Sequence, residues 1–524
     1  MAAAAVAAIA PLSATGLSRA HGMREGGTFL MAADGVQFTT IDPALFENPA
    51  PIVVLTAACG QLLTTPDKPL PAGYRIVPEI ATDLPRITNG GKTYTFTIRA
   101  GIRFSTGTLV TARDFAYTLN RIFLPALRSK HVGFPDLSAI VGAQDVLAGK
   151  AQTASGIVAR GNKLIITLTR PSGGFTAATA SLLTCVLPST LPPDPDGVKA
   201  PVPSAGPYYV SEFVPGQRVV LERNLFYTGD RPHHVDRIVV DLALDTATVV
   251  DKIERGELDY AWVPPDKISA RAPELVSKYG INKSRFFVAP TKFLRWFALN
   301  TARPLFRNNV RLRQAVNFAL DRKAIRREWG PLANAPSDQY LPAGFPGFQS
   351  KRIYPLDAPD LEKARALAMR HTRGGKAVLY VPSFPVAVAQ AQIVRDNLSE
   401  IGLDVAIEQI PPPAYFTKVS TPGEPFDIAW YGFLWPFVDP SFVQLVTQAS
   451  RFHSPTFDLR LARASRLPFG PERNRAYGEL DVDLARNAAP AAAYGYDNAL
   501  TLVSERTGCV VANPYLDLAA VCLR

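Results

Sequence analysis

Apolar and threonine side chains alternate at the start of residues 94–123, whose sequence is YTFTIRAGIRFSTGTLVTARDFAYTLNRIF. Tyr94, Phe96 and Ile98 are separated by threonines, and this two-residue period is typical of a strand with one buried face. A turn at residues 99–101 follows, and residues 102–104 are predicted to return as a second strand. The pattern therefore predicts a hairpin.

A helix is predicted directly after this hairpin. Thr111 and Asp114 have the spacing of a capping box, in which each side chain bonds the backbone N–H of the other residue. Phe115, Leu119 and Ile122 follow at the spacing of one helix face. The segment holds no histidine, carboxylate pair or glycine cradle for phosphate, so we interpret it as structural.

Strands and helices alternate through much of the remaining chain. A hairpin is predicted around residues 215–216, and a β-α-β unit is predicted between residues 235 and 260. A strand ending at Asn300 precedes a helix with Val316, Ala319 and Leu320 on one face. Later helices are predicted at 360–369 and 387–400, and later strands at 377–381, 405–407, 426–431 and 500–503. This alternation predicts an α/β fold.

Two segments resemble a known family. The pattern R-x-G-x-x-F-S-x-G-T at residues 99–108, followed by T-A-x-D-F, is similar to a signature of family 5 (peptide/nickel type) substrate-binding proteins of ABC importers. Residues 293–325, FLRWFALNTARPLFRNNVRLRQAVNFALDRKAI, resemble a second block of that family. The resemblance implies a two-lobed α/β fold like the periplasmic binding proteins, of type II, with an extra subdomain and a hinge between the lobes.

The resemblance also implies how the chain is divided. Lobe I would comprise residues 27–56, 203–290 and 493–524, and residues 57–202 would form its extra subdomain. Lobe II would comprise residues 291–492, and the hinge crossovers would fall near residues 289–292 and 492–496. Pro290 suits a crossover because its ring fixes φ.

Composition and charge narrow the classes of function. The 524 residues are 47% hydrophobic and 19% charged, enough for two or three globular domains, with a net charge of +11. The basic residues are scattered, so we expect no nucleic-acid binding. We interpret the densest group as the solvated face of a helix: Arg311, Arg313, Arg322, Lys323, Arg326 and Arg327.

The N-terminal sequence and the cysteines bear on the compartment. Residues 1–26 are Ala-rich and lack a positive n-region, so we interpret them as an export-signal remnant or a flexible tail. An exported protein would pair its cysteines, whereas a cytosolic one would bury them as thiols. Four cysteines allow three pairings. We favour Cys509 with Cys522, across a turn at Asn513, and then Cys59 with Cys185.

Motifs for catalysis and metal binding are missing from the sequence. It contains no H-E-x-x-H, G-x-S-x-G or G-x-x-x-x-G-K motif, and adjacent His233 and His234 would point apart on a strand. We therefore expect no catalytic residues, no metal and no cofactor.

The best candidate for a ligand site is the segment 426–442, FDIAWYGFLWPFVDPSF. A strand is expected to end at residues 431–432, so the aromatic residues and Asp439 beyond it would line a cleft. Core packing is the alternative, favoured for Trp430 and Phe433. The site residues we predict are Trp435, Asp439, Phe437 and Trp430, with Tyr260, Trp262, Asp42 and Arg295 on or near the facing lobe.

The same loop departs from the peptide-binding members of the family. In those members, an aspartate three residues before an acidic residue–proline pair neutralises the α-amino group of the peptide. Here that pair is Asp439-Pro440, and an ungapped alignment puts Pro436 at the position of the aspartate. Asp439 would have to substitute, or the ligand has no free amino terminus. Nickel receptors carry a tryptophan and a proline in this loop, but no histidine-rich cleft supports nickel.

The resemblance implies a non-enzymatic, extracytoplasmic receptor, in the periplasm or on the outer face of the membrane. A monomer peripheral to the membrane would capture a peptide or similar solute between its lobes and deliver it to ABC permease subunits. The alternatives are an exported hydrolase using the same cleft, a receptor for a sugar or metal chelate, and a sensor.

Overall fold

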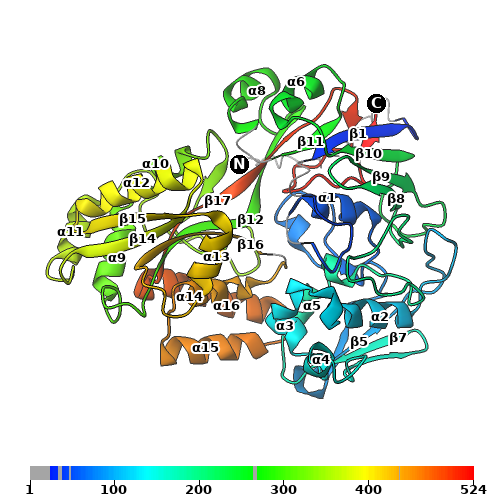
Figure 1. Ribbon diagram of the computed structural model, residues 1–524, viewed down its shortest axis with the longest axis horizontal. Helices are drawn as coiled ribbons and strands as arrows, with labels where there is room; N and C mark the ends of the chain where they lie inside the picture. Colours follow the sequence, from blue (N-terminus) through cyan, green and yellow to red (C-terminus); the bar gives the residue numbers. More distant parts are fainter. Residues whose placement is uncertain (1–23, 34–37, 47–48, 264–267, 436) are drawn as a thin grey trace, which may run out of the picture.

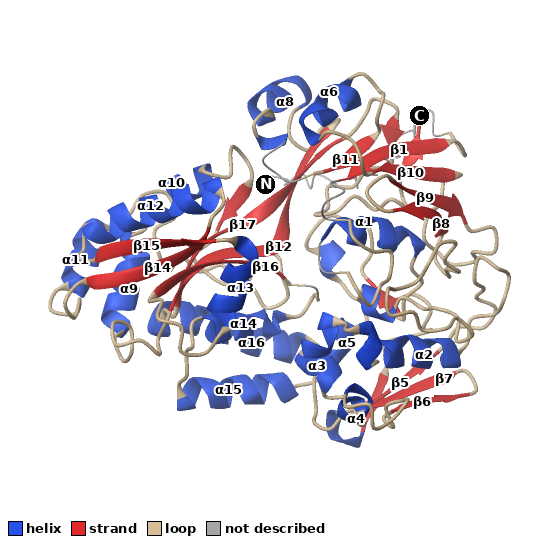
Figure 2. Ribbon diagram, in the orientation of Figure 1, coloured by secondary structure: helices blue, strands red, loops and turns tan. Residues whose placement is uncertain are grey.

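Three larger β-sheets, beside two of two strands each, organise the described part of the chain (Figures 1 and 2). The computed structural model describes residues 24–33, 38–46, 49–263, 268–435 and 437–524. Residues 1–23 of the predicted export-signal remnant, and Pro436, lie outside the described residues. No helix in the described ranges has the length and apolar character needed to cross a membrane.

A mixed sheet of five strands contains the first described strand. β1 (Thr28–Ala33) runs parallel to β10 (Arg237–Asp241) and β11 (Tyr260–Trp262), and β9 (Arg218–Arg223) and β8 (Tyr208–Val214) add antiparallel neighbours. This confirms the predicted hairpin at 215–216. Helices α6 (Val249–Glu254) and α8 (Ala272–Tyr279) lie beside β11, and α1 (Pro49–Ala58) lies beside β8 (Figure 1).

A second, antiparallel sheet contains the alternating residues Tyr94 and Phe96. Its order is β4 (Arg86–Thr88), β5 (Thr93–Thr97), β7 (Lys163–Thr167) and β6 (Ile157–Arg160). The capping box of α2 (Ala112–Ile122) is confirmed. The predicted return strand at 102–104 is wrong. β4 and β7 occupy both edges of β5, and residues 102–110 instead fold back on themselves, with the Val110 amide donating to the Ile102 carbonyl.

These two sheets share one apolar core. Phe29 of β1, Phe96 of β5 and Phe115 of α2 belong to a single continuous cluster of buried side chains. The predicted subdomain 57–202 therefore does not have a core of its own. We call both sheets and their helices the first lobe.

The six-stranded sheet and its helices form the second lobe, except for the ends of β12 and β17 that reach the first lobe. Its order is β13 (Asn334–Pro336), β17 (Ala491–Leu502), β12 (Phe286–Leu299), β16 (Ile428–Leu434), β14 (Lys376–Pro382) and β15 (Asp404–Ile410). Helices cover both faces: Phe297 and Leu299 pack in one cluster, and Trp296 and Ala298 in another. The predicted α/β, two-lobed fold is confirmed.

Helices on the two faces come from different stretches of the chain. One face carries α9 (Val310–Ala319), α11 (Leu361–Ala368) and α12 (Pro385–Ser399), with α10 (Arg322–Arg327) beside it. The other carries α14 (Val443–Ala449), α15 (Pro455–Arg466) and α16 (Pro471–Asp483). α13 (Pro412–Ser420) packs on a smaller cluster at β14 and β16.

Two long strands pass between the lobes. Phe286–Pro290 of β12 pairs with Leu502–Asn498 of β17 in the first lobe, and Leu294–Ala298 pairs with Tyr496–Ala491 in the second. The register shifts between Pro290 and Leu294, next to the predicted crossover. Residues 500–503 are not a separate strand, since β17 reaches Leu502 without interruption.

The basic group on α9 and α10 is not a uniformly solvated face. Arg313 and Arg322 are buried, and Arg322 donates from Nε to the Ala493 carbonyl and from Nη1 to the Asn317 carbonyl. Burial lowers the pKa of the Arg322 guanidinium to about 10. The solvated-face interpretation is wrong for these two residues because they satisfy backbone carbonyls inside the second lobe.

Candidate functional site

A cavity of about 210 Å³ lies between the lobes. The second lobe contributes side chains from the crossover and from the end of β16: Lys292, Leu434, Trp435, Phe437 and Val438. The first lobe contributes residues from α1, from the loop at 64–74 and from the C-terminal segment 513–517. Both lobes must therefore be in place for this cavity to exist.

Aromatic side chains form one wall of the cavity. β16 continues to Leu434, further than predicted, and Trp435 follows at the strand end. Its ring packs edge-to-face on Phe437 at 5.9 Å and Phe442 at 5.6 Å, and meets Phe134 of the first lobe at 6.4 Å. The buried Trp435 Nε1 has no hydrogen-bond partner. Trp435 and Phe437 thus line the cavity, although Phe437 is almost fully buried, and their contact with a ligand stays a prediction.

Lys292 places a positive charge in the cavity wall. It lies where the register of β12 breaks, and its side chain is half-buried. Within the described ranges, no acid forms an ion pair with its ammonium group. Burial lowers the pKa of Lys292 to about 8, because the charged form is desolvated and no carboxylate offsets that cost.

Carboxylates gather in the first-lobe wall. Asp67 accepts a hydrogen bond of 2.7 Å from Asn513 Nδ2, and Asp517 lies 3.6 Å from Arg231 Nη2. Burial, and then the negative charge of Asp517, raises the pKa of Asp67 to about 6. This wall therefore carries acids that the protein only partly neutralises.

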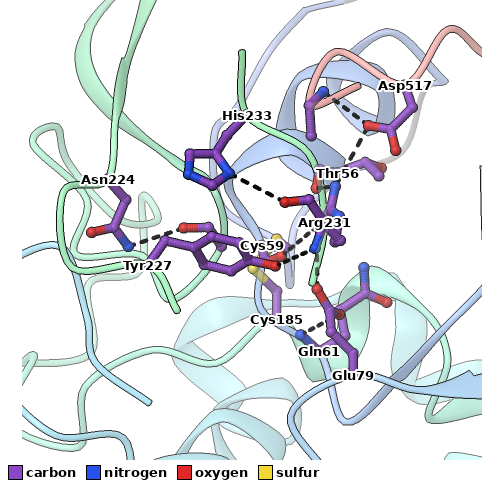
Figure 3. Close-up of polar contacts among 12 residues, drawn as sticks. Thr56, Cys59, Gln61, Glu79, Cys185, Asn224, Tyr227, Arg231, His233 and Asp517 are labelled. Atoms are coloured by element: carbon purple, nitrogen blue, oxygen red, sulfur yellow. Dashed lines mark hydrogen bonds and ion pairs between the residues drawn. A yellow bond between two sulfur atoms is a disulfide. The ribbon is translucent and has the colours of Figure 1, made fainter. Parts of the chain in front are cut away.

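Arg231 connects this wall to the rest of the first lobe (Figure 3). Its Nη2 donates to the Thr56 carbonyl at 2.7 Å and its Nη1 to the Cys59 carbonyl at 3.0 Å. Nη1 also lies 3.3 Å from Glu79 Oε1. Burial opposes the charge on Arg231, but Asp517 and Glu79 outweigh it and raise the arginine pKa. The guanidinium of Arg231 is therefore hydrogen-bonded and ion-paired within the protein.

A smaller cavity of about 100 Å³ adjoins the first and shares Pro514 and Tyr515 with it. Tyr260 and Trp262 line this second space, together with Thr291 and Phe293 of β12. The structure thus brings the predicted first-lobe aromatics near the crossover, in a space beside the main cavity.

Four other predicted site residues are placed in structural roles. Asp439 is 1% exposed and pairs with Arg473 at 2.9 Å, so the expectation that it faces a ligand is wrong. The expectation that Asp42 faces a ligand is also wrong, since Asp42 is fully buried and pairs with Arg121 at 2.7 Å.

The remaining two, Arg295 and Trp430, are also engaged inside the protein. Arg295 of β12 pairs with Asp497 of β17 at 2.6 Å and joins the crossover strands. Trp430 donates from Nε1 to Gln390 at 2.8 Å within the second lobe. The expectation that Arg295 contacts a ligand is therefore wrong, because its guanidinium is satisfied by Asp497. Trp430 has the core packing that was favoured for it.

The cavity residues that the sequence did not reveal come from distant segments. Asp67 lies in the loop at 64–74, for which the sequence predicts no site, and Lys292 lies in the predicted crossover. The turn at Asn513 bears on the pairing of Cys509 with Cys522 in the sequence, and in the structure it also lines the cavity. The sequence shows a lysine at the crossover and prolines in the loop at 64–74. It does not show that these two segments line one cavity, because only the fold brings them together.

Two disulfides hold the first lobe. Cys59 is bonded to Cys185, and Cys509 to Cys522; no free cysteine remains. The first bond lies beside Arg231 (Figure 3) and links the end of α1 to residue 185. The second fastens the C-terminal segment that contributes residues 513–517 to the cavity.

Comparisons with known proteins agree with this architecture. The periplasmic oligopeptide-binding protein OppA of Salmonella typhimurium is 25% identical over 441 residues, covering 78% of this chain and 77% of OppA. The probable deoxycholate-binding periplasmic protein YgiS of Escherichia coli is 28% identical over 53% of this chain and 51% of its own. This chain therefore spans about half of YgiS.

Solved structures show the same fold. The unliganded open form of the murein tripeptide-binding protein MppA superposes with a TM-score of 0.78 at 21% identity, over 96% of this chain and 98% of its own. The family model of bacterial extracellular solute-binding proteins, family 5, matches residues 75–451. This protein belongs to family 5 of the bacterial extracellular solute-binding proteins.

Proposed function

We propose that this protein binds a short peptide outside the cytoplasm and delivers it to the permease of an ABC importer. The observation that carries the proposal is the cavity whose walls come from both lobes. A ligand held there touches both walls only when the lobes are together, so binding favours the closed arrangement. The permease would then distinguish loaded from empty receptor by its shape.

Peptide is the ligand class favoured by the relatives. Several are named as oligopeptide- or murein peptide-binding proteins, and related folds include a DppA in complex with the peptide STSA. The mixed lining suits a peptide, since aromatic rings pack on side chains while charged groups meet polar ends. The proposal involves no catalytic step, and the receptor would act as a monomer.

Ligand carried through purification tests this proposal directly. The protein, purified without denaturant from its natural host, is unfolded, and the released small molecules are identified by mass spectrometry. We expect short peptides near one per protein. Refolded, ligand-free protein should bind a synthetic copy in calorimetry.

Other ligands would change the conclusion in defined ways. A steroid acid or other non-peptide solute, bound again by the refolded protein, would keep the receptor and overturn the peptide assignment. A protein that carries nothing, and binds no peptide of two to five residues, would overturn the proposal.

A further inference from the structure

The two charged walls of the cavity are not balanced within themselves. Lys292 has no carboxylate partner among the described residues, although it is half-buried in the second-lobe wall. Water and salt screen the charge of an exposed lysine. A lysine in a cavity wall is screened less and attracts an anion that enters the cavity more strongly. An anionic group is therefore favoured beside Lys292.

The first-lobe wall has the opposite imbalance. Asp67 and Asp517 line this wall together with one guanidinium, that of Arg231, which lies 3.6 Å from Asp517 and also pairs at 3.3 Å with Glu79, a residue outside the cavity lining. Three carboxylates and one cation leave an excess of negative charge when all are ionised. Asp67 itself has an amide, Asn513 Nδ2, as its direct partner. A cationic group is therefore favoured beside Asp67.

The two walls act as separate ends of one cavity. Lys292 lies at the register shift of β12, whereas Asp67 lies in the loop at 64–74 and is bonded to Asn513, and within the described ranges no ion pair joins the two. Apolar and aromatic residues, among them Trp435 and Phe437, complete the lining. The cavity thus offers a cation at the crossover, acids at the first lobe and an apolar wall.

We propose that the cavity selects a dipolar solute, with a carboxylate bound at Lys292 and an ammonium group bound at Asp67. This inference rests on the proposed function and specifies the direction of the ligand. A peptide would place its carboxyl end at the crossover and its amino end at the loop containing Asp67. The buried Asp439, paired with Arg473, would take no part.

Binding of one tripeptide in three forms tests the proposal. The probes are Ala-Phe-Ala with free ends, its C-terminal amide and its N-acetyl derivative, each titrated into the refolded protein by calorimetry. For the wild type we expect each blocked end to weaken binding by about thirtyfold, the size of a lost charged hydrogen bond. Lys292→Met should bind the acid and the amide equally weakly, and Asp67→Asn should no longer distinguish free from acetylated peptide.

Matched controls and opposing outcomes separate this inference from the proposed function. Lys376→Met and Asp196→Asn remove the charges of exposed residues away from the cavity and should leave all three affinities unchanged. Thermal melts verify folding, and Lys292→Gln is the substitute if Lys292→Met is unstable. Equal binding of the three forms by the wild type, or continued discrimination by the variants, would overturn the dipolar site while leaving the receptor intact. Failure of every peptide of two to five residues to bind would overturn both.

Discussion

The backbone amide of Gly173 donates a 3.1 Å hydrogen bond to the carbonyl oxygen of Ser465. Gly173 belongs to the first lobe and Ser465 to α15 of the second, so the lobes touch there as well as at the crossover strands. Arg473 packs against the same glycine while pairing with Asp439. The cavity thus lies in a molecule whose lobes are already in contact.

A side chain at position 173 should separate the lobes. A Cβ added to Gly173 would lie 2.0 Å from the Leu467 carbonyl oxygen, a contact that backbone cannot relieve without moving. We expect Gly173→Ala to increase the radius measured by X-ray scattering and to weaken ligand binding by about tenfold, because fewer molecules are binding-competent. Gly133→Ala, where a Cβ meets nothing within 4 Å, is the control. An unchanged radius would show that this contact does not hold the lobes together.

Trp435 should be a central binding residue. Its ring joins the aromatic wall and reaches Phe134 of the other lobe. Trp435→Ala should weaken ligand binding by about 2 kcal/mol or more, as expected of an aromatic anchor. Phe416→Ala removes an exposed ring on α13 and should have no effect. Wild-type affinity in a stably folded Trp435→Ala protein would assign the ring to packing alone, and would direct attention to Tyr260 and Trp262.

Asp481 should make the protein less stable as pH rises. Burial raises the pKa of this fully buried carboxyl to about 7 in the folded state, from 3.8. Between these values the unfolded chain is ionised while the folded chain keeps its proton, so the free energy of unfolding falls as pH rises from about 4 to 7. Above pH 7 the loss is constant.

Asp481→Asn should remove this pH-dependent loss of stability, because asparagine does not ionise. Its side-chain oxygen can still accept the hydrogen bond that the Tyr340 amide donates to the Asp481 carboxyl at 2.9 Å. Relative to wild type, the variant should gain about 2 to 4 kcal/mol between pH 4 and pH 8 in urea denaturation. Asp396→Asn, on the exposed side of α12, is the control. A stability difference that is independent of pH would contradict this account.

The two disulfides should contribute unequally to stability. The cysteines of the first are 126 residues apart and those of the second 13, so the first restricts the unfolded chain more strongly. Replacing Cys59 and Cys185 together by alanine should cost about 2 kcal/mol more than replacing Cys509 and Cys522. Thiol titration of denatured, unreduced wild type should find no free thiol. Equal costs would indicate that local packing, rather than loop length, determines each contribution.

The fold was largely predictable, because local patterns and tertiary packing agree in most elements. Thr111 and Asp114 gave the start of α2, and the apolar spacing gave its buried face. The return strand at 102–104 failed because β4, just before β5, takes one edge of β5 and β7, at residues 163–167, takes the other. Sequence periodicity contains no information about which edge of a strand is already occupied.

The cavity was only partly predictable. Trp435 follows a strand end, and such positions often line ligand sites. Asp439 has the same local setting but meets Arg473, which lies 34 residues away and cancels its charge. Lys292 was overlooked for the opposite reason, since nothing local shows that a lysine will lack a partner. Burial and pairing of charges are properties of the assembled lobes.

The contribution of residues 513–517 to the cavity wall constrains biosynthesis. Those residues are translated after both crossover strands, so a ribosome-bound chain that ends before them cannot yet have a complete binding site. A ligand that needs this wall would therefore be bound only after residues 513–517 have been synthesised. A nascent chain arrested before residue 513 should accordingly remain unable to hold the solute that the finished protein binds.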